Sequence, residues 1–222
     1  MAHVLSVNIG SARPSRHAQI RQTGIDKRPA AGPVELHAPG PKGVDGSGVS
    51  GDTVCDLRHH GGPDQAVYAY AREDLDRWQE ALGRTLAPGM FGENLTTVGI
   101  DLTEARIGER LRVGRTVVLE VSCPRIPCRT FAGFMGERGW VRRFTQEGRP
   151  GAYLRVLAEG PVEAGDAIQV EHRPEHDVTI GLMFRALTTE RALLPRLLAA
   201  GGALPPQTRA EILSATASSP RP

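Results

Sequence analysis

Leu111-Arg112-Val113-Gly114-Arg115-Thr116-Val117-Val118-Leu119-Glu120-Val121 indicates the fold more directly than any other stretch of the chain. Apolar and β-branched residues stand on both sides of Gly114-Arg115, a pair that favours a tight turn. We therefore predict a β-hairpin, with one strand over Leu111–Val113 and the next from Thr116 through Val121. An isolated hairpin is only marginally stable in water, so other segments must supply more strands.

Other short apolar runs are also rich in strand-forming residues and bounded by turn-forming residues. Glycine (26 residues) and proline (17 residues) interrupt them at turn-like intervals through the first three quarters of the chain. Besides the hairpin, the runs that we predict to be strands are Val4–Ile9, Val34–His37, Tyr153–Leu157 and Ile168–Val170. The chain is therefore predicted to be mainly β with some α-helix, and its strands to form a barrel or a sandwich.

Two helices are predicted within this β-rich part. Apolar residues recur at helical spacing from Leu75 to Leu82, and Gly83 follows where that helix should stop. We expect this helix to lie on the outside of the barrel. A shorter helix is predicted over Trp140–Gln146, ended by Glu147-Gly148-Arg149-Pro150.

After Arg173-Pro174 the segments favour helix rather than strand. The segments predicted to be helices there are Val178–Leu187, Glu190–Ala200 and Gln207–Ala215. Thr188 or Thr189 is predicted to N-cap the second of them. We predict a domain boundary near residue 174, which gives a β-rich domain over 1–173, a three-helix module over 174–217 and a disordered tail over 218–222.

The composition excludes several classes of protein. A chain of 222 residues can bury a large core without disulfides. No stretch approaches the roughly 18 uninterrupted apolar residues of a membrane span, and the first residues lack the pattern of a secretory signal. A net charge of +2 gives no reason to expect sequence-independent binding to nucleic acid. We therefore expect a cytoplasmic globular protein that binds neither membrane nor nucleic acid.

Ser122-Cys123-Pro124-Arg125-Ile126-Pro127-Cys128-Arg129 follows the predicted hairpin and is the segment best suited to chemistry. Its two prolines prevent continued sheet or helix, so the loop should be rigid. Arg125 and Arg129 flank Cys128, and nearby cations favour the thiolate, which is the form that ligates metals or acts as a nucleophile. Alternatively, both cysteines are small core residues and the arginines are solvated.

Two further segments are candidate ligand sites. In His59-His60-Gly61-Gly62-Pro63-Asp64, the glycine pair can expose backbone N–H groups to a phosphate or an oxyanion. In Phe91-Gly92-Glu93-Asn94-Leu95-Thr96, Asn94 can donate an amide hydrogen bond to a ligand, and Glu93 can pair with a basic neighbour. Each segment is also explained by an ordinary turn next to a strand, without any ligand.

Other common sites have weaker support. Cys55, His59, Cys123 and Cys128 are all possible zinc ligands, but no Cys-x-x-Cys or His-Glu-x-x-His pattern is present. The sequence also lacks a Walker loop, a dinucleotide-binding glycine fingerprint and the Gly-x-Ser-x-Gly turn of hydrolases. None of these sites therefore accounts for the cysteine loop.

Several segments, taken in order, resemble the MOSC family (molybdenum cofactor sulfurase C-terminal domain), and in particular its stand-alone YiiM-like branch. The matching segments are Gly24-Ile25-Asp26-Lys27-Arg28-Pro29, Gly51-Asp52, His59-His60-Gly61-Gly62-Pro63-Asp64-Gln65-Ala66-Val67-Tyr68-Ala69-Tyr70, Phe91-Gly92-Glu93-Asn94-Leu95-Thr96, Ile107-Gly108-Glu109-Arg110 and Pro124-Arg125-Ile126-Pro127-Cys128. Any one of them would be a weak match, whereas five or six in the same order are specific. The resemblance runs from about His3 to Val170, and the helical segments after it resemble the three-α module of this branch.

The resemblance implies a β-barrel-like fold, a bound molybdenum–molybdopterin cofactor, and Cys128 as the protein ligand to molybdenum. A thiolate is a soft donor that suits such a metal. The residues that would bind the cofactor are Lys27, His59, His60, Gly61, Gly62, Asp64, Gly92, Glu93, Asn94, Arg125 and Cys128. Cys128, Asn94 and Arg125 would be the catalytic residues. Lys27 would contact the cofactor phosphate, because a flexible ammonium suits a single phosphate.

The chain departs from the family pattern at two places. Ala30 follows Lys27-Arg28-Pro29 where relatives tend to have valine, and Arg129 follows the cysteine where many have an aromatic residue. The second difference affects the mouth of the expected site. Cys55 and Cys123 would take no part in it.

The activity implied by the resemblance is two-electron reduction of N-hydroxylated or N-oxygenated small molecules, such as hydroxylaminopurines and amidoximes. The sequence has no flavin, haem or iron–sulfur signature, so a separate reductase protein would have to deliver the electrons. The chain is expected to be a monomer or a homodimer. Two alternatives stay open: a protein that carries the cofactor or sulfur without turnover, and a ligand-binding module without cofactor.

Overall fold

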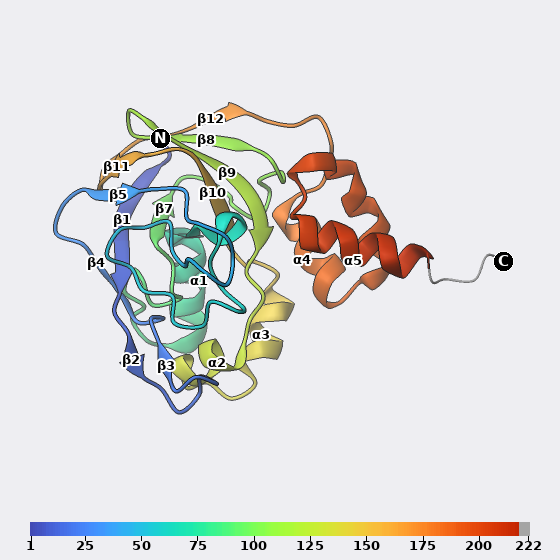
Figure 1. Ribbon diagram of the computed structural model, residues 1–222. Helices are drawn as coiled ribbons and strands as arrows, with labels where there is room; N and C mark the ends of the chain where they lie inside the picture. The colour runs from blue at the N-terminus through green and yellow to red at the C-terminus, as the bar shows by residue number, and fades with distance from the viewer. Residues whose placement is uncertain (218–222) are drawn as a thin grey trace.

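Most of the β-structure lies in one eight-stranded sheet (Figure 1). In the computed structural model, which describes the backbone of residues 1–217 and the side chains of residues 1–214, every pair of neighbouring strands is antiparallel except β6 and β7. The strands in spatial order are β12 (Ile168–His172), β8 (Arg110–Val113), β9 (Val117–Pro124), β10 (Ala152–Ala158), β6 (Val67–Ala71), β7 (Leu95–Val98), β1 (His3–Gly10) and β4 (Lys27–Pro29).

The sheet curls back on itself without closing. His3 and Ala167 form an isolated bridge, and the N–H of Val4 donates to the carbonyl of Asp166 at 2.9 Å. Two small sheets flank the large one: β5 (Val34–Leu36) pairs with β11 (Gly160–Val162), and β2 (Arg13–Pro14) pairs with β3 (Gln22–Thr23). The predicted class, mainly β with α-helices, is confirmed, but the sheet is not a closed barrel.

The predicted hairpin is present as β8 and β9, with a difference at its turn. Val113 pairs with Val117, so the loop holds three residues, Gly114, Arg115 and Thr116, rather than two. Gly114 has a φ of 59°, a conformation that favours glycine. The strands predicted to begin at residues 4, 34, 153 and 168 are present as β1, β5, β10 and β12, and the bounds of each lie within two residues of the prediction.

Three α-helices share one hydrophobic cluster with strand β6 of the large sheet. The helix predicted from Leu75 is α1 (Arg72–Leu82), which joins β6 to β7 and ends at Gly83 in the left-handed conformation. The helix predicted from Trp140 is α3 (Trp140–Glu147). The helix α2 (Arg129–Met135) was not predicted, because Gly133 in its interior is unfavourable for a helix and the segment follows a proline-containing loop. One turn of 3₁₀ helix, η1 (Pro63–Gln65), precedes β6.

Aromatic side chains fill the space between these helices and the sheet. The ring centroids of Trp78 and Trp140 lie 4.6 Å apart, and Phe131 meets Phe91 edge to face at 5.2 Å. Phe144 joins the same group and is fully buried. Because each aromatic ring buries a large area and prefers particular contact geometries, this cluster fixes α2 and the loop before it.

Three helices follow the sheet and lie at one side of it (Figure 1). They are α4 (Ile180–Thr188), the kinked 3₁₀ helix η2 (Arg191–Ala203) and α5 (Pro206–Ala217). Residues of α4 and η2 belong to the same hydrophobic cluster as the strands. The domain boundary near residue 174 stays a prediction, and the tail predicted over 218–222 lies outside the described residues. In the part of the chain that the structure describes, no helix is long and apolar enough to cross a bilayer.

The predicted N-cap at Thr188 or Thr189 is wrong. Thr188 is the last residue of α4, and its hydroxyl donates to the carbonyl of Phe184 at 2.6 Å, one turn earlier. Thr189 follows the end of α4, and the residue before η2 is Glu190, whose side chain makes no capping bond. The threonine that does cap a helix is Thr179, whose hydroxyl accepts the N–H of Leu182 at 3.1 Å.

Replacing this cap tests how much α4 contributes to folding. Thr179→Ala should lower the free energy of unfolding by about 1 kcal/mol, because it leaves an N–H group of the first helical turn without a partner. Thr189→Ala is the matched control and should change it by less than about 0.5 kcal/mol. Urea unfolding of the two variants measures the difference, and equal effects would contradict the capping role of Thr179.

Candidate functional site

A cavity of about 620 Å³ lies between the loop after β9, the turn before η1 and the β2–β3 hairpin. The predicted site residues that line it are Lys27, His59, His60, Gly61, Gly92, Asn94, Arg125 and Cys128. The predicted site residues outside its lining are Gly62, Asp64 and Glu93. The fold thus brings the three candidate segments together at one cavity, and their roles toward a cofactor stay predictions.

Cys128 stands where the proline-containing loop turns into α2. It is the residue before the helix, with φ −122° and ψ 171°, and its carbonyl accepts the N–H of Ala132 at 3.0 Å. Its side chain is half-buried and lines the cavity. The thiol is therefore fixed in direction by the loop and the helix, while it stays accessible from the cavity.

Arg125 is a buried cation beside this cysteine, with 7% of its surface exposed. Its Nη1 donates to the carbonyl of Phe91 at 2.5 Å, and its guanidinium lies 4.1 Å from the ring centroid of Phe131. Its Nε is buried without a hydrogen-bond partner, and no ion pair among the described side chains includes it. A buried cation without a carboxylate partner favours an anionic ligand in the cavity.

The two consecutive histidines differ in environment. His59 is exposed, whereas His60 is half-buried. Burial, helped by the nearby charge of Arg125, lowers the pKa of His60 to about 4. His60 is therefore neutral at pH 7, where it can donate or accept a hydrogen bond but adds no charge to the cavity.

Asp52 joins several of the lining residues, although no role was predicted for it. Its carboxylate forms an ion pair with the ammonium of Lys27, whose own burial lowers its pKa. It also accepts a hydrogen bond from the side-chain amide of Asn94 at 2.9 Å. That amide donates its second hydrogen to the carbonyl of Asn8 at 3.3 Å. Both amide hydrogens of Asn94 are thus used within the protein, so donation to a ligand would require one of these bonds to break.

Glu93 is buried outside the lining of the cavity and binds the loop that contains it. Its carboxylate accepts the N–H groups of Gly89 at 2.6 Å and Phe91 at 2.9 Å, and the hydroxyl of Thr96 at 2.9 Å. Burial raises its pKa. Instead of the basic partner that the sequence suggested, Glu93 therefore binds the backbone of its own turn.

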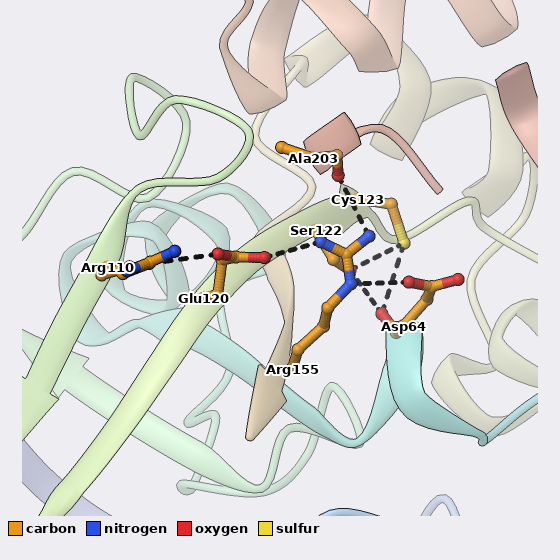
Figure 2. Close-up of polar contacts among 7 residues, drawn as sticks. All are labelled: Asp64, Arg110, Glu120, Ser122, Cys123, Arg155 and Ala203. Atoms are coloured by element: carbon orange, nitrogen blue, oxygen red, sulfur yellow. Dashed lines mark hydrogen bonds and ion pairs between the residues drawn. The ribbon is translucent and has the colours of Figure 1, made fainter. Parts of the chain in front are cut away.

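Asp64 lies outside the lining of the cavity, and its carboxylate contacts Arg155 of β10 (Figure 2). The Nε of Arg155 donates to the Asp64 carboxylate at 2.7 Å, and its Nη1 donates to Glu120 at 2.8 Å. The remaining nitrogen, Nη2, donates to the carbonyl of Ala203 in η2 at 3.0 Å. The hydroxyl of Ser122 donates to the backbone carbonyl of Asp64. Asp64 therefore holds the His-Gly-Gly turn to the sheet rather than contacting the cavity.

The other two cysteines have different positions. Cys55 lines the cavity, so it is closer to the candidate site than the sequence suggested. Cys123 is outside the lining, and burial raises its pKa to about 11. Across the described residues, no group of three or more His, Cys, Asp or Glu side chains could hold a metal ion, which leaves the zinc alternative without a site.

Sequence reasoning missed a part of the lining. The β2–β3 hairpin contributes His17, Ala18, Gln19, Ile20 and Gln22, and the sheet contributes Tyr68 and Tyr153. The hairpin carries no motif that would have identified it. Its position depends on contact with α2, where a Cβ added at Gly133 would lie 2.1 Å from the ring of His17.

The comparison with known proteins agrees with this arrangement. A sequence profile of the MOSC domain matches residues 56–169. The chain belongs to the MOSC domain family. Relatives of this MOSC chain include the Bacillus subtilis protein YflK, 37% identical over 80% of this chain and 76% of YflK. A Gibberella moniliformis protein named Reductase is 31% identical over 73% of this chain, but the match spans only 30% of that protein.

Solved MOSC structures place the chain in the YiiM-like branch. YiiM from Geobacillus stearothermophilus superposes with a TM-score of 0.77 and 27% identity, over 96% of this chain and 98% of that one. YiiM from Escherichia coli has the same fold, with a TM-score of 0.72 over 98% of this chain and 94% of that one. By sequence, the E. coli protein is 31% identical over 60% of each chain.

The buried environment of His60 gives a pH-dependence that can be tested. The imidazole titrates near pH 6.5 when unfolded and near pH 4 when folded, so the unfolded chain binds more protons between these values. The free energy of unfolding should therefore fall as the pH is lowered from 6.5 toward 4. This fall should be smaller for His60→Gln than for the wild type. Exposed His59→Gln should follow the wild type. Urea unfolding at pH 6.5 and pH 4.5 measures this, and parallel losses in all three proteins would refute it.

Proposed function

We propose that this MOSC protein is a molybdenum-cofactor-dependent reductase of N-hydroxylated small molecules. The observation that carries the proposal is the position of Cys128, whose accessible thiol shares one cavity with the unpaired cation Arg125 and the turn at His60 and Gly61. A metal–pterin cofactor with a phosphate is anionic and needs one soft protein ligand, and this cavity offers both a cation and a thiol. The residues present therefore fit the group.

Each residue has a defined part in holding such a cofactor. Cys128 would ligate the metal as a thiolate, and Arg125 would compensate negative charge beside it. Neutral His60 and the backbone at Gly61 and Gly92 would contact the pterin. Lys27 would contact the phosphate with the ammonium hydrogens that Asp52 does not take. When bound, the cofactor supplies the two-electron redox chemistry that side chains lack.

The substrate is proposed to be a hydroxylaminopurine, an amidoxime or a related compound. Reduction of an N–OH group to N–H consumes two electrons and two protons and releases water. Tyr68, Tyr153 and the aliphatic residues of the hairpin would exclude solvent around a planar substrate. The electrons would come from a separate reductase protein.

Replacing the proposed ligand gives a direct test. Wild-type protein from a molybdate-fed host that makes the cofactor should contain about one molybdenum per chain, and Cys128→Ser should lose most of it, since a hydroxyl is a poor soft donor. Cys123→Ser is the matched control and should keep the metal, because Cys123 lies outside the cavity. Metal analysis gives the content, and turnover of 6-hydroxylaminopurine with reduced viologen gives the activity.

The same measurements separate the alternatives. Metal-loaded protein that hands its cofactor to an apo-enzyme but never reduces 6-hydroxylaminopurine would identify a carrier. Wild-type protein that stays free of molybdenum in this host would leave a ligand-binding module. Equal metal loss in Cys128→Ser and Cys123→Ser would reject Cys128 as the ligand.

A further inference from the structure

Basic residues are concentrated in two segments of the chain. Residues 11–30 contain five Lys or Arg and one Asp, and residues 125–143 contain five Arg and one Glu. The whole chain has 27 basic and 25 acidic residues, so the remainder is net negative. The charge of the molecule is therefore strongly uneven, although its net charge is small.

Parts of both basic segments line the cavity. The β2–β3 hairpin lies beside α2 at one end of the molecule (Figure 1), and His17 is in close contact with Gly133. Residues of the hairpin and the start of α2, including Gln19 and Arg129, line the cavity. Of the exposed arginines in these segments, Arg129 lines the cavity, and Arg16 and Arg21 are next in the chain to the lining residues His17 and Gln22.

The surface of this rim suits a protein partner. Arg16, Arg21 and Arg129 are exposed, and none of them has an ion-pair partner among the described residues; Arg16 bonds only to His17. Ile20 and Ile126, which also line the cavity, expose 37% and 45% of their surface. Apolar residues surrounded by arginines are typical of protein interfaces.

We infer that this basic rim, defined by Arg16, Ile20, Arg21, Ile126 and Arg129, is the docking surface for an acidic electron-carrier protein. The inference rests on the proposed function, which requires an external donor. A reduced iron–sulfur or flavin protein would give up two electrons in total for each substrate, and the substrate would take these with two protons to give the amine and water. Complementary charge would steer the carrier to the opening nearest the thiol.

The exposed isoleucines favour a protein over a nucleic acid, which would be held by phosphate contacts to a continuous basic surface. A small anionic substrate could also be attracted by the rim. Such a substrate would respond to the charge of the rim whichever donor supplied the electrons. Comparison of two donors therefore separates these possibilities.

The test uses the molybdenum-loaded protein with Arg16→Glu and Arg21→Glu combined, neither of which lines the cavity. Arg115→Glu is the matched control, because Arg115 is exposed in the β8–β9 turn, at the opposite end of β1 from the hairpin. Reduction of 6-hydroxylaminopurine is driven either by reduced plant-type ferredoxin, a small acidic carrier, or by reduced methyl viologen. Molybdenum content and urea unfolding of each variant check that the holoprotein is intact.

The double variant should lose about tenfold or more of the ferredoxin-driven rate at low salt and keep the viologen-driven rate, with the difference shrinking at high salt. Arg115→Glu should match the wild type with both donors. The docking surface is rejected if the double variant and Arg115→Glu lose the same fraction of the ferredoxin-driven rate. It is also rejected if the double variant loses the ferredoxin-driven and viologen-driven rates equally, which would indicate that the rim steers the substrate. It is also rejected if the variant loses binding to a single-stranded oligonucleotide but keeps the ferredoxin rate. Wild-type protein inactive even with viologen would overturn the proposed function itself.

Discussion

The carboxylate of Asp52 holds together the wall on which the candidate site depends. It accepts the N–H of Gly10 at 2.8 Å, the hydroxyl of Ser47 at 2.8 Å and the amide of Asn94 at 2.9 Å, in addition to its ion pair with Lys27. These partners come from β1, β4, the start of β7 and the loop before Asp52. Removing one partner of a buried ion pair typically destabilises a protein by about 3–5 kcal/mol. Asp52 therefore offsets the burial of Lys27 and fixes the strand ends around the cavity.

The opposite wall depends on packing rather than on charge. Phe131, at the start of α2, packs edge to face on Phe91 at 5.2 Å, and Arg125 lies across its ring. The carbonyl of Phe91 also accepts a hydrogen bond from Arg125. Phe91 and Phe131, which are far apart in the chain, thus fix the position of Arg125. Pro127 restricts the backbone between Arg125 and Cys128, so the position of the cysteine is restricted too. Aromatic rings of Phe131 and Tyr68 lie against the guanidinium, which lines the cavity, so packing holds the charge at the cavity wall.

The sequence predicted local features well and long-range relations poorly. Periodicity located β1, β10, α1 and α3 because each is long enough to show an alternating or helical pattern. The helix α2 was missed because Gly133 weakens its helical pattern, and the cap at Thr179 was missed because several threonines near the helices fit the pattern equally well. Motifs identified the cavity residues around His60, Asn94 and Cys128. The role of Asp52 and the position of the hairpin depend on contacts between residues far apart in the chain, which no single sequence displays.

The segment His59–Asp64 shows why a matching motif is not a list of ligand contacts. His60 and Gly61 line the cavity, while Asp64 turns outward to Arg155. Arg155 uses all three nitrogens, and its third bond reaches the carbonyl of Ala203 in the C-terminal helices. A charge-assisted bond to each partner is worth more than a neutral one, so the turn, the sheet and η2 are held in one arrangement. Such a segment contains residues that face the ligand and residues that orient the backbone. Both kinds belong to the same motif, and only the structure separates them.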